Sequence, residues 1–153
     1  MEMRTIVPIM AAFGLLAASV VNAGGGLINQ SSQFSVQKTA DRFVVAAEKA
    51  GLKIFARIDH AAGAAKVGKS LRPTQLIIFG SPKVGTALMT SDQRAGIDLP
   101  LKALAWQDAE GKVWLSYNSP DYLFGRFGID DRSAVKKKIT GALLKLAGAA
   151  TQP

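Results

Sequence analysis

The sequence predicts a single compact α+β domain, with a mixed, mostly antiparallel sheet of about five strands packed on helices and an amphipathic helix at the C-terminus. Segments in which apolar and polar residues alternate, typical of strands, are interspersed with segments that carry apolar residues three and four positions apart, typical of helices. Two of the strand segments flank a three-residue loop that ends in glycine, which indicates an antiparallel hairpin. The 153 residues are 48% hydrophobic, enough for one core.

Residues 1–23 have the pattern of a signal peptide. A basic start precedes an almost wholly apolar stretch (residues 5–21), and small residues up to Ala23 stand where a signal peptidase cleaves. We expect cleavage after Ala23 and a periplasmic or secreted product with no membrane span, and a retained membrane anchor is the alternative. Residues 24–33, rich in Gly, Ser, Asn and Gln, are expected to form a flexible tether, which leaves 34–148 as the folded domain.

The start of this domain predicts a strand followed by a helix. In residues 33–38, Phe34 and Val36 alternate with polar neighbours, which is typical of a half-buried strand. Thr39 can then cap a helix whose apolar residues lie at helical spacing. That helix is expected to stop at Gly51, since glycine adopts the left-handed backbone conformation freely.

The middle of the chain predicts two further strands. Residues 52–59 alternate in polarity, so Arg57 and Asp59 are expected to point the same way, and a short helix over 61–67 follows. Residues 76–79 are all apolar and predict a strand covered on both faces.

Residues 101–106 and 112–118 form the predicted hairpin. The loop between them fixes the register and places Trp106 opposite Trp114 on one face of the sheet. The face that we expect helices to cover carries Ala103, Ala105, Leu115 and Tyr117.

The last segment predicts an amphipathic helix, capped by Asp130 or Asp131, with an apolar stripe over 135–146. Lys136-Lys137-Lys138 lies beside this stripe and is the only run of like charges, although 19 Lys and Arg against 11 Asp and Glu give a net charge of +8. No aromatic residues accompany the run. We therefore interpret it as a solvated helix face and expect no nucleic-acid binding.

A series of short motifs in fixed order carries a family resemblance. It includes Ile58-Asp59-His60, Phe79-Gly80 with Pro82-Lys83, Gly85-Thr86 with Leu88-Met89, Asp98-Leu99-Pro100, Trp106-Gln107-Asp108, Gly111-Lys112-Val113-Trp114 and Tyr117-Asn118. Over residues 34–129 the chain resembles the family called domain of unknown function 302. The resemblance implies a compact α+β domain with a mixed sheet packed on helices, often carried by exported bacterial proteins, and it implies no established activity. Ser81, where Asn is common, and the basic helix after Ile129 lie outside the family pattern.

The residue types present exclude several classes of site. Without cysteine the chain has no cysteine nucleophile, zinc finger or iron-sulfur ligand set. Serine occurs in no Gly-x-Ser-x-Gly motif, so a hydrolase triad has no sequence support. With one histidine and no cysteine, only oxygen donors remain for a metal ion, and we predict no metal site and no cofactor.

His60 is the only histidine and directly follows Asp59, which leaves two interpretations open. Imidazole titrates near neutral pH and a carboxylate can orient it, so His60 is a candidate general base with Asp59 as its partner. Alternatively, Asp59 caps a helix and His60 is a turn residue, since adjacent strand residues point to opposite faces.

The segment over 80–86 has glycines between a strand and a helix, as phosphate-binding loops do. The nucleotide-binding motif requires lysine directly after the second glycine, where this chain has Thr86, and Lys83 lies inside the loop instead. Lys83 and the loop amides remain candidates to hold a carboxylate or another small anion. Alternatively, the glycines and Pro82 only shape the turn.

Polar residues at strand ends give the leading functional hypothesis, because strand ends and their loops commonly form binding sites. We expect them to meet in one polar corner that binds a small anionic ligand or ion without catalysis. Its candidate residues are Asp59, His60, Lys83, Asp98, Arg57, Tyr117 and Asn118. Two other hypotheses stay open. One is an enzyme with His60 as base, Asp59 as its orienter and Lys83 as anion clamp, and the other is an envelope interaction domain or homo-oligomer that uses Trp106 and Trp114.

Overall fold

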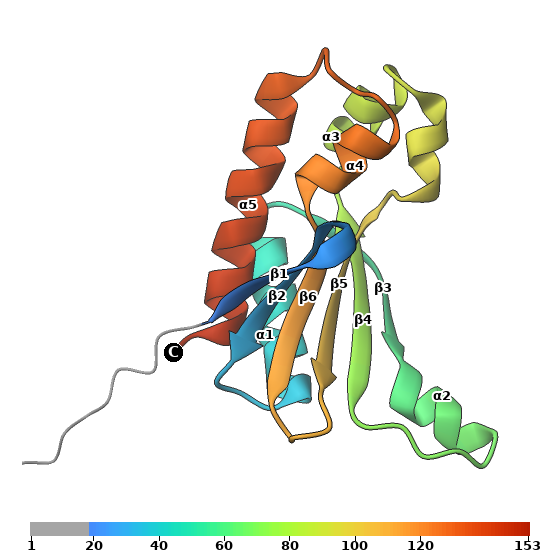
Figure 1. Ribbon diagram of the computed structural model, residues 1–153, viewed down its shortest axis with the longest axis vertical. Helices are drawn as coiled ribbons and strands as arrows, with labels where there is room; N and C mark the ends of the chain where they lie inside the picture. The colour runs from blue at the N-terminus through green and yellow to red at the C-terminus, as the bar shows by residue number, and fades with distance from the viewer. Residues whose placement is uncertain (1–18) are drawn as a thin grey trace, which may run out of the picture.

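A six-stranded sheet with helices on one face forms the domain, which a computed structural model describes for residues 19–153 (Figure 1). The strands are β1 (Val20–Ala23), β2 (Leu27–Ser32), β3 (Lys53–Asp59), β4 (Thr74–Gly80), β5 (Leu101–Gln107) and β6 (Val113–Asn118). The helices are α1 (Val36–Lys49), α2 (His60–Lys66), α3 (Pro82–Met89), α4 (Pro120–Arg126) and α5 (Ser133–Thr151), with short 3₁₀ helices η1 (Gly24–Gly26) and η2 (Gln93–Ile97). The strand order is β1-β2-β6-β5-β4-β3.

The predicted α+β class with a C-terminal helix is confirmed, with one correction to the sheet. Every neighbouring pair of the six described strands is antiparallel, so the sheet is not mixed. The reason lies in the connections. From β3 to β6 each strand lies next to the one before it, which reverses the chain direction each time, and α1 carries the chain from β2 to the far edge at β3.

The N-terminal part of the domain contradicts two expectations. Residues 27–32 are not a flexible tether, because they pair with β6 along their whole length, and the predicted strand over 33–38 is the connection to α1 and its first turn. The polar composition of β2 was misleading. Its Gln30 is buried and donates a hydrogen bond to Thr151 Oγ1 at 2.7 Å, so the amide is satisfied inside the core.

The predicted signal peptide lies mostly outside the described residues, which begin at residue 19, and it stays a prediction. Strand β1, at the end of that segment, pairs with β2 at the edge of the sheet. Among residues 19–153, no helix combines the length and the hydropathy needed to cross a membrane.

The caps of the two long helices differ from the predicted ones. Ser35 caps α1 through a hydrogen bond from the Lys38 amide at 3.2 Å, whereas Thr39 is fully buried and donates to the Ser35 carbonyl at 2.9 Å. Helix α5 has Arg132 at its N-cap position and no side-chain cap, so neither Asp130 nor Asp131 caps it, and Asp131 accepts a hydrogen bond from Ser91 at 2.8 Å. The predicted stop of α1 at Gly51 is confirmed by its φ of 75°.

The core lies between one face of the sheet and helices α1 and α5, which lie behind and beside the sheet in Figure 1. Phe43 of α1 meets Phe79 of β4 edge to face, with ring centres 4.8 Å apart. The strand residues buried on this face include the predicted set, Ala103, Ala105, Leu115 and Tyr117. The hairpin register is also confirmed: Trp106 pairs with Trp114, and Gly111 in the loop has a φ of 82°.

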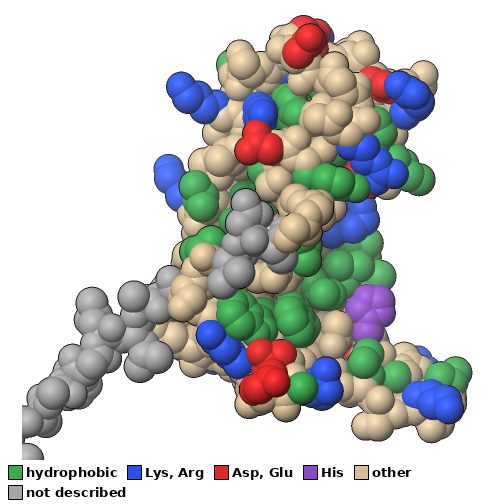
Figure 2. All heavy atoms as spheres, in the orientation of Figure 1, with side chains coloured by type: hydrophobic (Ala, Val, Ile, Leu, Met, Phe, Trp, Pro, Cys, Tyr) green, Lys and Arg blue, Asp and Glu red, His purple; other side chains and the backbone are tan. Residues whose placement is uncertain are grey.

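The opposite face of the sheet carries no helix within the described part of the chain. Figure 2 shows hydrophobic side chains gathered on it, with charged side chains at its lower end. Leu76 and Ile78 of β4 are only half-buried there, so the expectation that this strand is covered on both faces is wrong. Helices α1 and α5 both lie on the other side, so among residues 19–153 neither of the two long helices covers this face.

The two tryptophans on this open face have their indole N–H groups satisfied within the domain. Trp106 donates to Ser116 Oγ at 2.7 Å, and that hydroxyl donates to Asn29 Oδ1 at 2.6 Å. Trp114 donates to Asp108 at 2.7 Å, and this hydrogen bond, as the largest cause, holds the pKa of the Asp108 carboxyl below its ordinary value. The open face therefore presents mainly aromatic and aliphatic surface.

Tyr117 generates a stability prediction. Its side chain is 3% exposed, and no group within residues 19–153 forms a hydrogen bond with its hydroxyl. Burial raises the pKa of Tyr117 above its ordinary value. The unfolded chain therefore loses this proton first, and stability that is present below about pH 10 is lost as the pH rises towards the pKa of the folded state.

We expect Tyr117→Phe to raise the free energy of unfolding by about 1 kcal/mol at neutral pH, because it removes an unsatisfied buried hydroxyl. The variant should also lose less stability than the parent above pH 10. Urea unfolding between neutral pH and pH 11 measures both effects. A variant that is less stable than the parent at every pH would show that the hydroxyl has a partner in solution.

Candidate functional site

The predicted polar corner does not form, because its residues lie at opposite ends of the sheet. Asp59 pairs with Gln75 at one end of the β3–β4 ladder, and Lys53 pairs with Gly80 at the other. Gly80 lies five positions after Gln75 along the extended strand, a distance of about 17 Å. Lys83 follows Gly80, so it lies at the end remote from Asp59 and His60. Antiparallel pairing is the physical reason. It places the C-terminal ends of successive strands at opposite ends of the sheet.

Asp59 and His60 have the structural roles that the alternative interpretation gave them. The Asp59 carboxylate caps α2 by accepting a hydrogen bond from the Ala62 amide at 2.9 Å. His60 is the first residue of α2 and is exposed, and the described structure shows no hydrogen bond between the two side chains. The enzyme hypothesis therefore lacks the oriented base that it needs.

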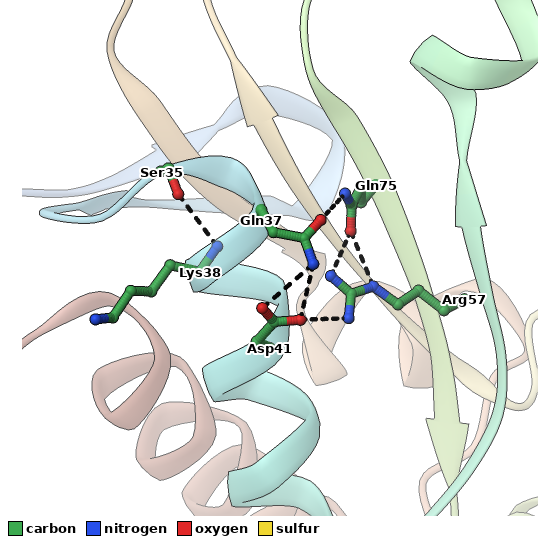
Figure 3. A network of polar contacts seen from close by, with 6 residues as sticks. All are labelled: Ser35, Gln37, Lys38, Asp41, Arg57 and Gln75. Carbon is green, nitrogen blue, oxygen red and sulfur yellow. Dashed lines mark hydrogen bonds and ion pairs between the residues drawn. The ribbon is translucent and has the colours of Figure 1, made fainter.

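Arg57 belongs to a separate network that joins the edge strand β3 to α1 (Figure 3). Its guanidinium donates to Gln75 Oε1 at 2.9 and 2.6 Å and to Asp41 at 2.5 Å. Gln75 donates to Gln37 at 2.7 Å, and Gln37 donates to Asp41 at 3.1 Å, which closes the ring of contacts. Because each of these four side chains is hydrogen-bonded to others of the set, the network ties sheet to helix and gives Arg57 a structural role.

The remaining predicted residues lie at the other end of the sheet, except Tyr117, which is in the core. Asp98 forms an ion pair with Arg126 at 3.0 Å. Asp98 and Asn118 both line a cavity of about 20 Å³, which is room for one water molecule and not for an organic ligand. Lys83 is exposed on the first turn of α3. Within the described residues no three acidic or histidine side chains gather closely enough to hold a metal ion.

An apolar cleft at this same end of the sheet is the best-formed candidate site. Its volume is about 280 Å³, and four separate segments enclose it: β3, the β4–α3 connection with α3, η2, and the start of β5. Its lining residues are Phe55, Gly80, Ser81, Pro82, Val84, Gly85, Thr86, Met89, Gly96, Leu99, Pro100 and Leu101. We call it the α3 cleft. None of these side chains carries a charge, so the cleft favours apolar groups.

The local geometry of β3 and β4 creates the α3 cleft. A bulge between Ile54 and Ala56 turns Phe55 out of the regular alternation, to the edge where it lines the cleft. Gly80 ends β4 and the chain turns into α3 at Pro82. Sequence reasoning identified this glycine-containing segment as a turn, but neither the bulge nor the approach of Leu99 from a distant loop has a signal in the local pattern.

Another cavity and a groove differ from the α3 cleft. A cavity of about 140 Å³ shares Gly80, Ser81, Val84 and Leu101 with the cleft and extends between them and α5. A groove of about 490 Å³ runs along α1, lined mostly by polar and charged side chains, none of them buried. Because burial of apolar surface is the main source of affinity for a small organic molecule, the α3 cleft and not this groove is the favoured site.

The Arg57 network yields a prediction about stability. Arg57→Met keeps the aliphatic stem but removes both hydrogen-bond donors to Gln75. Gln75 is buried, with 8% of its surface exposed. We expect the free energy of unfolding to fall by about 1–3 kcal/mol, since a buried carbonyl oxygen loses its donors. The control is Arg94→Met, which breaks the ion pair between Arg94 and Asp92. Because the Arg94 side chain is 81% exposed, this variant should change the free energy of unfolding little. Equal losses in both variants, measured by urea unfolding, would contradict the structural role of the network.

Comparison with known proteins agrees with this architecture. A crystal structure of an uncharacterized conserved DUF302 protein from Bacillus stearothermophilus superposes with a TM-score of 0.73 at 13% identity, covering 82% of this chain and 98% of that one, which shows a shared fold. Proteins named fluoride-specific ion channel FluC 1, from Brucella suis and Brucella abortus, are 44% identical over 126 residues, 81% of this chain. The chain spans about half the length of these curated relatives, 49% and 46%. The model of the family described as "Domain of unknown function DUF302" matches residues 28–146, and the chain therefore belongs to this family.

Proposed function

We propose that this protein is an exported domain that binds a small organic ligand, and that the α3 cleft is its binding site. The observation that carries the proposal is a concave cleft of about 280 Å³ enclosed by four chain segments and lined almost wholly by apolar atoms. Its volume lies at the lower end of the range of ligand pockets, so the ligand is smaller than a typical drug-sized molecule. The polar corner has no place in this proposal, because its residues do not meet.

Two glycines keep the α3 cleft open. A Cβ atom added at Gly85 would have Leu99 and Met89 side chains at 3.9 Å, which is ordinary contact distance, and one added at Gly96 would lie 3.2 Å from the Met89 sulfur. Larger side chains at either position would therefore occupy the space of a ligand. Gly85 is inside α3 and its backbone conformation is ordinary, so a substitution there fills the cleft without backbone strain.

Gly85→Leu tests the proposal. In ¹⁵N-labelled protein of the parent sequence, indole added as a probe is expected to shift the amide resonances of residues that line the α3 cleft. The variant should lose these shifts, because the leucine side chain fills the site.

The matched control is Gly63→Leu, the same substitution on the exposed helix α2 with open space around the new Cβ. It should bind indole as the parent does. The proposal is wrong if indole leaves the cleft amides unchanged in the parent, or if its effects persist in Gly85→Leu.

Export is the second part of the proposal, supported by the basic start, the apolar stretch and the small residues before Gly24. Cleavage after Ala23 would remove β1 from the edge of the sheet and leave β2 paired with β6. N-terminal sequencing of the protein from a periplasmic or culture fraction is expected to begin at Gly24. A product that retains Met1 and stays with the cell interior would contradict export.

A further inference from the structure

Resting on the proposed function, we infer that the ligand of the α3 cleft is a small monocarboxylate with an apolar body. The body would lie against the lining side chains, and the carboxylate would lie at the mouth. Three features of the described residues support this assignment: the apolar lining, two lysines beside lining residues that have no acidic partner, and two hydroxyl groups that form no other hydrogen bond.

The lining determines the body of the ligand. Phe55, Val84, Met89, Leu99 and Leu101 supply side chains without hydrogen-bonding groups, and the glycines expose little more than backbone. An inorganic ion would gain nothing from such surface, whereas a compact aromatic or aliphatic group would be desolvated favourably. The class of ligand is therefore organic, with most of its atoms apolar.

Two lysines without ion-pair partners adjoin the lining of the cleft. The Lys53 ammonium lies 5.1 Å from the centre of the Phe55 ring, and Phe55 is itself a lining residue. Lys83 is exposed and lies between the lining residues Pro82 and Val84. Neither lysine forms an ion pair with any carboxylate of residues 19–153.

The two acidic residues that flank η2 are paired with arginines. Asp92 is paired with Arg94 at 2.6 Å, and Asp98 with Arg126 at 3.0 Å. No carboxylate belongs to the lining of the cleft. An anionic head group would therefore meet two lysines without ion-pair partners and no carboxylate in the lining of the cleft.

Two hydroxyl groups supply the short-range contacts that an anion needs. Ser81 and Thr86 both line the cleft. Ser81 stands at the N-cap of α3, yet its side chain makes no capping hydrogen bond, and the described structure gives neither hydroxyl another partner. A carboxylate with one negative charge fits this small set of donors beside an apolar lining, because it brings less charge to desolvate than a phosphate group does.

A pair of probes with nearly the same shape tests the assignment. Benzoate and benzamide have the same apolar body, and only benzoate carries charge. Calorimetric or NMR titration of the full chain is expected to show benzoate binding about tenfold more tightly than benzamide, the effect of one charge-assisted hydrogen bond. Added salt should narrow this difference, because the lysines are at the surface.

Charge-removing variants locate the head group. Lys53→Met and Lys83→Met are each expected to weaken benzoate binding several-fold and to leave benzamide binding unchanged, since methionine keeps the aliphatic stem. Lys53→Arg should retain the preference for benzoate. The control is Lys69→Met, an exposed lysine beyond α2 at the opposite end of the sheet, which should affect neither probe.

The outcomes separate this inference from the proposed function. Equal affinity for benzoate and benzamide, or unchanged benzoate binding in both methionine variants, would overturn the monocarboxylate assignment while the indole experiment still supports the cleft. Failure of indole to reach the cleft in the parent protein would instead overturn the proposed function, and the ligand assignment with it.

Discussion

Antiparallel pairing of β3, β4 and β5 decides which segments meet at each end of the sheet. Since each strand reverses the direction of the one before, the end of β4 lies beside the start of β5 and beside the start of β3. The α3 cleft forms at this junction, from the residues that leave β4 and those that enter β5. The end of β3, with Asp59 and α2, lies at the opposite end of the sheet and takes no part in the cleft.

Because helices cover only one face of the sheet, the two faces and the edge carry residues with different roles. On the covered face the strands contribute small and apolar residues, and Gln30 reaches Thr151 so that β2 is also bonded to α5. At the edge, Arg57 and Gln75 join β3 and β4 to α1 by polar contacts. On the open face, Ser116 and Asn29 take up the indole N–H of Trp106. These buried polar groups are hydrogen-bonded, and the hydroxyl of Tyr117 is the exception among the buried side-chain groups of residues 19–153.

The α3 cleft combines features that are separate elsewhere in the molecule. Arg57 of β3 and Asp41 of α1 form an ion pair, and the tryptophans of the open face donate hydrogen bonds within the domain. At the cleft, apolar walls, free hydroxyl groups and unpaired ammonium groups occur together. This combination suits a ligand that is partly apolar and partly anionic, as we propose for this chain.

Local pattern alone determined the α+β class, the hairpin register with Trp106 opposite Trp114, and the end of α1 at Gly51, because alternation and left-handed glycine positions are properties of neighbouring residues. It placed the first strand wrongly, since β2 is polar in composition and becomes a strand only by pairing with β6. The local pattern could not predict which strand ends lie side by side. Strand order and direction depend on contacts between residues far apart in the chain, so only the tertiary structure could separate Asp59 from Lys83 and bring Phe55 to Leu99.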